Sequence, residues 1–487
     1  MTDKVRLGLL STGVPGLDVL LGGGLTEFSF TLIAGAPGSG KTTLAHQIMF
    51  ALASDKRRAL FFTVLGEPPL KMLRYQQQFS FFDVSKVGPC IRYVNLADDL
   101  RAGHFSGVLE RIMREVEDFQ PGLVFVDSFR SVMQTARGGS QGLTDLQEFI
   151  QELGSRMATW QATTFLIGEY THTDVEAHPI ITVADGMVTL SQSADDNSEL
   201  RKIRVNKMRG QAHMSGAHTM RITDDGVRAY PRQLPPLADD RLPGTPISRD
   251  PKRIATGVPG LDELMKGGVP QGHTMLVSGP TGIGKTILAT RFLQAGAARG
   301  EKGVAVYFEK GTSRLRNAEL AELVQAGQVE IVETRSLSLS VEELLDDLMS
   351  AIDRIGATRV VIDSLSEIEL YLAPEVRADL RLAVFRTLTA LAKRGVTTVV
   401  AVGIDEMRGM MQLSPDDLCF LTDAVVALRY AEIGGALRKF LTVVKVRGCD
   451  HSNDIREFHI TDTGIEVEPR PAPFEAVLTG WPRPHGT

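Results

Sequence analysis

The strongest constraint on the fold is an internal duplication. The segment STGVPGLDVLLGGGL at residues 11–25 returns as ATGVPGLDELMKGGVP from residue 255, and LIAGAPGSGKTTLAHQIMFAL returns as LVSGPTGIGKTILATRFLQAG. The offset is constant, and Lys41 and Lys285 lie 244 residues apart. A chain of 487 residues is also too long for one core. We therefore expect two tandem domains, each built from one unit of roughly 230 residues.

The domain boundaries follow from the repeat and from local composition. The first copy occupies residues 1–228 and the second occupies residues 254–470. Residues 229–253 are rich in proline and mixed charges, which disfavour regular secondary structure and predict a linker. Residues 471–487 are again interrupted by prolines, and we expect a short C-terminal tail there.

Within each copy, short apolar runs alternate with helical periodicity. This alternation is typical of the α/β class, in which helices cover both faces of a mostly parallel sheet. Two later runs, residues 186–192 and 200–208, have no helix between them and predict an antiparallel extension. In the first copy the expected strands are residues 31–36, 58–64, 122–128 and 163–168, and the expected helices are residues 41–54, 105–119 and 143–157.

Each copy also contains a glycine-rich loop between an apolar strand and a helix. GAPGSGKT and GPTGIGKT both match the P-loop pattern G-x-x-x-x-G-K-[ST]. Backbone N–H groups of such a loop wrap a polyphosphate, and the helix N-terminus adds a favourable dipole. We therefore predict ATP binding, with Lys41 and Lys285 meeting the β- and γ-phosphates during catalysis. The predicted nucleotide-binding residues are Gly35, Ala36, Pro37, Gly38, Ser39, Gly40, Lys41, Thr42, Thr43, Gly279, Pro280, Thr281, Gly282, Ile283, Gly284, Lys285, Thr286 and Ile287.

Acidic residues after the strands are candidates for supporting hydrolysis. An aspartate that ends an apolar strand holds a metal ion together with the P-loop threonine. The predicted Mg²⁺ ligands are Thr42, Asp127, Thr286 and Asp363. A further acid would orient the attacking water, and Glu67 and Glu309 are the catalytic candidates, although they are not equivalent in register. A solvated loop carboxylate is the alternative interpretation of each.

A basic motif, K-x-R-G-x-x-H, also occurs twice. It lies 80 residues after Asp127 in VNKMRGQAH and 82 residues after Asp363 in VKVRGCDH. The charge that develops on a γ-phosphate needs a cation, which a neighbouring P-loop unit can supply. A solvated basic hairpin is the alternative. The residues predicted to act in trans are Lys207, Arg209, His213, Lys445, Arg447 and His451.

Bulk properties exclude several classes of protein. The formal net charge of -6 argues against a protein that coats duplex nucleic acid. The three scattered cysteines lack the spacing of a zinc or redox site and are expected to be free thiols. The N-terminus does not resemble a signal peptide, and no apolar run is long enough to span a membrane. We expect a soluble cytoplasmic protein that binds neither nucleic acid nor a membrane.

Together these features resemble the KaiC family of circadian-clock ATPases, within the RecA-like superfamily. The resemblance is carried by the tandem P-loops, the T-G-V-P-G-L-D segments and the basic motifs, and residues 428–464 are its most specific stretch. It implies two RecA-like domains and a homohexamer of two stacked rings, with ATP and Mg²⁺ bound between adjacent subunits. It also implies that the basic motif reaches the next subunit's γ-phosphate. In that family the first ring is a slow ATPase, and the second is an autokinase and autophosphatase.

This chain departs from the family pattern at the paired glutamates and at the phosphorylated Ser-Thr pair. The family's adjacent glutamates after the second strand correspond to Leu65-Gly66 and Glu309-Lys310. The phosphorylated Ser-Thr pair corresponds to Cys419-Phe420, which cannot accept a phosphoryl group as Ser or Thr would. The family's C-terminal peptide would extend beyond Thr487, so its clock partner is not expected here.

We therefore predict a Mg²⁺-dependent ATPase of the KaiC type, with a regulatory or signalling role and an unidentified protein partner. One alternative is a Ser/Thr autokinase that uses Thr422 or Ser414. A second is a RecA-like DNA-binding motor, although residues 130–142 and 365–379, where basic loops are needed, carry only modest charge. A third is a nucleotide-sensing scaffold with very little hydrolysis.

Overall fold

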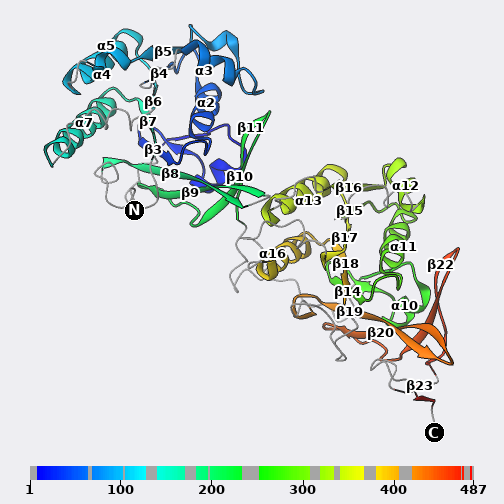
Figure 1. Ribbon diagram of the computed structural model, residues 1–487. Helices are drawn as coiled ribbons and strands as arrows, with labels where there is room; N and C mark the ends of the chain where they lie inside the picture. The colour runs from blue at the N-terminus through cyan, green and yellow to red at the C-terminus, as the bar shows by residue number, and fades with distance from the viewer. Residues whose placement is uncertain are drawn as a thin grey trace, which may run out of the picture. The chain divides into compact units, whose positions relative to one another are not determined.

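The computed structural model describes residues 8–63, 69–101, 105–127, 140–169, 183–195, 198–232, 252–307, 318–333, 340–366, 380–404, 419–472, 474–475 and 483–484. The chain divides into two compact units, residues 1–232 and 233–487, which are coloured blue to green and green to red in Figure 1. Each unit is described by itself below.

The first unit is an α/β domain built on one nine-stranded sheet. Its elements are β1 (Leu9–Leu10), α1 (Leu17–Leu21), β2 (Leu25–Thr26), β3 (Phe30–Gly35), α2 (Lys41–Leu52), β4 (Ala59–Thr63), α3 (Pro69–Gln76), η1 (Val84–Lys86), β5 (Ile91–Asn95), α4 (Ala97–Arg101), α5 (Phe105–Phe119), β6 (Leu123–Asp127), α7 (Ser140–Thr159), β7 (Thr163–Glu169), β8 (Gly186–Asp195), β9 (Ser198–Met208), β10 (Ala217–Thr223) and β11 (Gly226–Tyr230). The strand order is β11-β10-β9-β8-β3-β7-β6-β4-β5. The strands from β8 to β5 are parallel, whereas β9, β10 and β11 form an antiparallel extension.

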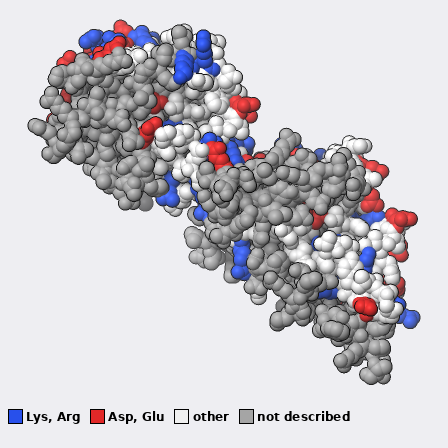
Figure 2. Space-filling model, viewed as in Figure 1, with Lys and Arg blue, Asp and Glu red and all other residues white. Residues whose placement is uncertain are grey.

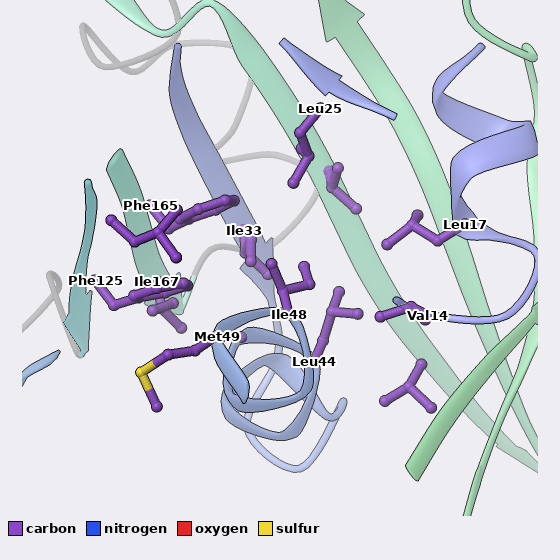
Figure 3. Close-up of a cluster of buried hydrophobic side chains, with 14 of the residues drawn as sticks. Val14, Leu17, Leu25, Ile33, Leu44, Ile48, Met49, Phe125, Phe165 and Ile167 are labelled. Carbon is purple, nitrogen blue, oxygen red and sulfur yellow. The ribbon is translucent and has the colours of Figure 1, made fainter. Parts of the chain in front are cut away.

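Helices cover both faces of this sheet and bury two apolar clusters. On one face, α5 and α7 pack on the strands. On the other face, α1 and α2 do so, and Figure 3 shows Leu44 and Ile48 of α2 beside Ile33 of β3 and Phe165 and Ile167 of β7. Burying each such side chain contributes about 1.5–3 kcal/mol relative to exposing it. The strand that precedes the P-loop is therefore held rigidly from both sides.

The second unit repeats this architecture. Its elements are β12 (Arg253–Ile254), α10 (Pro259–Leu264), β13 (Val269–Pro270), β14 (Thr274–Gly279), α11 (Lys285–Ala297), β15 (Gly303–Tyr307), α12 (Ala318–Gln325), β16 (Val329–Glu333), α13 (Val341–Ile355), β17 (Arg359–Asp363), α16 (Leu380–Lys393), β18 (Thr397–Gly403), β19 (Ala424–Ile433), β20 (Ala436–Val446), β21 (Arg456–Thr461), β22 (Gly464–Val467), β23 (Phe474–Glu475) and β24 (Arg483–Pro484). The strand order is β16-β15-β17-β18-β14-β19-β20-β21-β22, the same order as in the first sheet read from its other edge. The duplication seen in the sequence is thus a duplication of topology.

The predicted α/β class, with a mostly parallel sheet and an antiparallel extension, is confirmed. Strand β7 is one residue longer than predicted and ends at Glu169. The edge strand β5 was not predicted, because its half-buried residues do not form a continuous apolar run. Strand β11 ends at Tyr230 and β12 begins at Arg253, so both strand ends lie inside the segment that we expected as a linker.

The T-G-V-P-G-L-D segment forms the same hydrogen-bonded turn at the start of each unit. Asp18 Oδ1 accepts hydrogen bonds from the backbone N–H and the hydroxyl of Thr12, at 2.8 and 2.6 Å. Asp262 Oδ1 accepts the same two bonds from Thr256, both at 2.8 Å. The repeated sequence therefore encodes a local turn that leads into the short helices α1 and α10. No helix in the described part of the chain is long and apolar enough to cross a membrane.

Candidate nucleotide site and its basic motif

Each P-loop connects the central strand of its sheet to a helix, from β3 to α2 and from β14 to α11. The residue before each helix is a glycine in the left-handed region, with φ of 97° at Gly40 and 118° at Gly284. A Cβ atom at Gly40 would also lie 2.5 Å from Ile222 Cδ1, and one at Gly284 would lie 3.0 Å from Ile460 Cδ1. Only glycine fits this backbone conformation and this close approach.

The first P-loop lies along a cleft of about 410 Å³. The cleft is lined by Pro37, Gly38, Gly40, Lys41, Thr42, Thr43, Thr63, Met72, Tyr75, Gln76, Asp127, Glu169 and Ile222. The Lys41 ammonium donates to the carbonyl oxygen of Ala36 at 2.8 Å, so the loop's own backbone holds the lysine. Burial lowers the pKa of Lys41, and the negative charges of Glu169 and then Asp127 act in the opposite direction.

Thr42 and Asp127 lie together at the end of the cleft. The Thr42 hydroxyl donates to Asp127 Oδ2 at 2.7 Å. A hydroxyl and a carboxylate are the oxygen ligands that Mg²⁺ takes from a protein when phosphates and water complete its octahedron. These two residues therefore fit the predicted metal site. Among the described residues, no group of three or more His, Cys, Asp or Glu side chains is placed to hold a metal ion.

The second P-loop has the same lysine arrangement. Lys285 Nζ donates to the carbonyl oxygens of Gly279 and Pro280, at 2.9 and 2.8 Å. Asp363 ends β17 and is 7% exposed, whereas Thr286 is exposed. All residues of both predicted P-loops are described, and the structure places each set on one turn between a buried strand and a helix.

Behind the first P-loop lies a histidine that the sequence argument did not use. His46, on α2, is fully buried and stacks against Phe61 and Tyr93, with ring centroids 4.4 and 6.0 Å away. Its Nδ1 lies 2.7 Å from the carbonyl oxygen of Thr42. Burial lowers the pKa of His46 to about 4, although the hydrogen bond to Thr42 favours the charged form. Thr290 takes this place in the second unit, where its hydroxyl donates to the carbonyl oxygen of Thr286 at 3.0 Å.

The basic motifs lie at the opposite end of each sheet from the P-loop. In the first unit the backbone N–H of Arg209 donates to Asp185, whose own N–H donates to Phe30, the first residue of β3. The P-loop begins at Gly35, the last residue of the same strand. Five residues of strand span about 16 Å, which exceeds the reach of an arginine side chain. Arg209 therefore cannot contact a phosphate bound by its own P-loop.

The second unit shows the same separation. Arg447 N–H donates to the carbonyl oxygen of Asp423, and Asp423 N–H donates to that of Thr274, the first residue of β14. The second P-loop starts at Gly279, at the other end of that strand. In both units, therefore, the basic motif and the P-loop lie at opposite ends of the strands.

In both units an aspartate at the start of the strand next to the P-loop strand holds the motif arginine. Arg209 Nη1 donates to Asp185 Oδ1 at 3.0 Å, and Arg447 Nη1 donates to Asp423 Oδ1 at 3.2 Å. Both arginines are exposed despite these bonds. The guanidinium groups are therefore oriented by their own unit and still accessible from outside it.

The lysine and the glycine of the motif have distinct local roles. Lys445 Nζ donates to the carbonyl oxygens of Cys419 and Thr422, at 2.5 and 2.7 Å. Burial lowers the pKa of Lys445 and of Lys207, and the adjacent arginine adds to the effect. The glycines adopt φ of 73° at residue 210 and 70° at residue 448. This left-handed conformation favours glycine over residues that carry a Cβ atom.

The two histidines close the motifs and are half-buried. The Nε2 atom of His451 has no hydrogen-bond partner among the described residues. The backbone N–H of His451 donates to Asp450 Oδ1 at 3.0 Å. The three motif residues of the first unit lie at and just after the end of β9: Lys207, Arg209 and His213. Their counterparts in the second unit lie at and just after the end of β20.

The candidate phosphate acceptor Thr422 is buried. It is 1% exposed, and its hydroxyl donates to the carbonyl oxygen of Cys419 at 3.3 Å. Phe420 beside it is 74% exposed. Ser414, the other candidate, lies outside the described residues, as do Glu67 and Glu309.

One acid in the first cleft was missed. Glu169 follows the run TTFLIG, the strand predicted over residues 163–168, and is the last residue of β7. The sequence did carry a signal for this residue, because Glu169 directly follows an apolar run. The same signal identified Asp127.

Comparison with known proteins agrees with this geometry. The sequence model of the family described as "ATPase: KaiC" matches residues 10–233 and 254–472. The chain belongs to the KaiC family. Each matched region contains one P-loop, one strand-end aspartate and one basic motif, so the KaiC family match covers both sites.

Three KaiC relatives show how far the similarity extends. The circadian clock oscillator protein KaiC of Picosynechococcus sp. is 27% identical over 490 residues, which cover 97% of this chain and 92% of that protein. The circadian clock oscillator protein KaiC of Synechococcus elongatus is 27% identical, covering 99% and 93% of the two chains. The circadian clock oscillator protein KaiC 1 of Synechocystis sp. is 28% identical, with the same coverage.

The described surface carries charges of both signs. On the face shown in Figure 2, blue and red side chains are interspersed over the described part of each unit. The loops in which we considered DNA-binding basic residues fall largely in residues 128–139 and 367–379, outside the described part.

Proposed function

We propose that this chain is a Mg²⁺-dependent ATPase that binds ATP between the subunits of a homohexameric double ring and acts in regulation. The observation that supports this most directly is the separation of each basic motif from its own P-loop. Arg209 is ordered and exposed, yet it lies about 16 Å of strand away from the P-loop of its unit. A cation so placed serves a phosphate only when another copy of the chain brings its P-loop alongside.

The two halves of a site would then have different tasks. The P-loop backbone and Lys41 bind the β- and γ-phosphates, and the lysine exchanges the carbonyl oxygen of Ala36 for phosphate oxygens. Thr42 and Asp127 would hold Mg²⁺, which when bound offsets negative charge on the β- and γ-phosphates. Arg209 of the adjacent subunit stabilises the charge that develops on the γ-phosphate.

We propose hydrolysis rather than a cycle of Ser/Thr phosphorylation as the main activity. Thr422 is buried and bonded to Cys419, and the positions of the family's acceptor pair carry Cys419 and Phe420. A regulatory role fits the names of the three relatives, which are circadian clock oscillator proteins. The partner would be a protein that binds one state of the ring.

Subunit mixing tests the action in trans. All variants carry Lys285→Ala, so that only the first site turns over. Protein with Lys41→Ala lacks a working P-loop, and protein with Arg209→Ala lacks the cation. Each of these two proteins is expected to be nearly inactive by itself, because every interface lacks either the P-loop lysine or the arginine. In an equimolar mixture, about a quarter of the head-to-tail interfaces combine both intact halves, so about a quarter of the turnover returns.

Two controls define the outcome. Arg156→Ala removes an exposed arginine that pairs with Glu152 on α7, and turnover should stay unchanged. Size measurements with and without ATP should show a hexamer that ATP stabilises. A mixture that regains no activity, or a monomer indifferent to ATP, would refute the interface site.

A further inference from the structure

Strand β7 places a carboxylate beside the first P-loop. Glu169 is its last residue, and its Cα pairs with that of Gly35, where the P-loop begins. Side chains alternate along a strand, so Glu169 lies on the same face as Ile167, which packs in the cluster beneath α2. The carboxylate consequently lines the cleft next to Lys41.

Charge decides what this carboxylate can contact when a nucleotide is bound. In the cleft, the negative charge of Glu169 raises the pKa of Lys41 more than the charge of Asp127 does. A polyphosphate on Lys41 brings a second negative group close to Glu169. Carboxylate and γ-phosphate repel each other in direct contact, whereas a water between them can donate one hydrogen bond to the carboxylate.

The cleft contains a further polar group suited to such a water. Thr63 ends β4 on the same face of the sheet as Phe61 and lines the same cleft. It is 5% exposed, and its hydroxyl has no hydrogen-bond partner among the described residues. A buried hydroxyl of this kind is normally satisfied by protein or by ordered water.

The second unit has a glycine at the matching strand position. Its β18 ends at Gly403, which pairs with Gly279 just as Glu169 pairs with Gly35. A Cβ atom at Gly403 would meet Ser366 Oγ only at 3.4 Å, so the space does not force a glycine there. The Ser366 hydroxyl instead accepts a hydrogen bond from Gly403 N–H at 2.8 Å. The last residue of this strand is therefore a carboxylate in the first unit and a glycine in the second.

We propose that Glu169 binds the hydrolytic water of the first site and accepts its proton, and that the second site lacks this acid. The water oxygen forms a bond to the γ-phosphorus while the bond to the β–γ bridging oxygen breaks, and that electron pair leaves with ADP. The water's proton passes to the Glu169 carboxylate and then to the released phosphate. This inference rests on the proposed ATPase function and assigns the base at one of its sites.

The test measures the first site alone, in full-length protein that carries Lys285→Ala. Glu169→Gln keeps the size of the side chain and removes the base. We expect kcat to fall by about 100-fold or more, since 100-fold is the lower end of the range for losing a general base. The Kd for ATP should change by less than about threefold, because Lys41 and the loop remain. Glu152→Gln, on the surface of α7, should leave both quantities unchanged.

Each other outcome contradicts the assignment. A kcat within twofold of the parent, or a loss of kcat in Glu67→Gln but not in Glu169→Gln, overturns it. A loss of ATP binding in Glu169→Gln would make this residue a binding group rather than a base. If Lys285→Ala protein does not turn over while Lys41→Ala protein does, the inference fails, although ATP hydrolysis by the chain stands.

Discussion

The buried His46 predicts that the first unit loses stability in mild acid. An unfolded chain would bind a proton at this imidazole near pH 6.5, whereas the folded protein keeps it neutral down to about pH 4. Between these values the unfolded state binds more protons, so the free energy of unfolding rises with pH. The contribution is complete above pH 6.5 and is lost as the pH falls towards 4.

The size of the effect follows from the two pKa values. A difference of about 2.5 units corresponds to about 3.4 kcal/mol at the acid limit. Over the practical interval from pH 7.5 to pH 5, the same relation gives a loss of about 2 kcal/mol. Tyr93, which stacks on His46, stays neutral here, because burial raises its pKa.

The assay is urea unfolding at both pH values, followed by the fluorescence of Trp160 in the first unit. Other groups titrate in this interval, so the quantity of interest is the difference between the parent and His46→Gln. The glutamine cannot take up the proton. Between pH 7.5 and pH 5, the free energy of unfolding of His46→Gln should therefore fall by about 2 kcal/mol less than that of the parent. Equal losses in the two proteins would refute the argument that burial keeps His46 neutral.

Two further substitutions test packing and backbone in the second unit. Arg359 is 1% exposed and donates to Glu301 at 2.7 Å, so Arg359→Leu should lower the free energy of unfolding by about 3 kcal/mol in urea titrations followed by circular dichroism. A leucine occupies the matching place in the first sheet, Leu123, and an unchanged midpoint would show that the buried pair is dispensable. Gly448→Ala should cost about 1 kcal/mol in thermal unfolding, because φ is 70° although nothing lies within 4 Å of the added Cβ. Gly107→Ala, in helix α5 with equal space, should instead stabilise by a similar amount, and a gain at both positions would contradict the backbone argument.

Much of the fold could be predicted because its signals are local. Apolar runs identified the buried parallel strands, and the predicted helix at residues 105–119 coincides with α5. Edge strand β5 escaped because only part of it is buried, so it lacks the continuous run of a central strand. Glu169 escaped because its function depends on which strand lies beside the P-loop strand, and order within a sheet is set by long-range pairing.

The basic motif shows the same limit more sharply. Its distance from Asp127 along the chain suggested a link to the phosphates, but chain distance cannot tell which edge of a sheet a hairpin reaches. The reversal from β8 to β9 returns the chain to the edge where β3 begins, and this reversal places Arg209 away from its own P-loop. The sequence predicted a link between the motif and a phosphate, and the pairing of strands supports the proposal that this phosphate belongs to a second subunit.

The placement of P-loop and basic motif at opposite sheet edges also gives each subunit a polarity. In the proposed head-to-tail contact, the end of one subunit that carries the basic motif meets the end of the next that carries the P-loop. In the proposed ring, such head-to-tail contacts repeat until the last subunit meets the first. If Arg209 acts in trans as proposed, one chain that lacks it disables its neighbour's site and leaves its own intact. The loss of activity then appears in the nucleotide site of the neighbouring subunit, always on the same side of the altered chain.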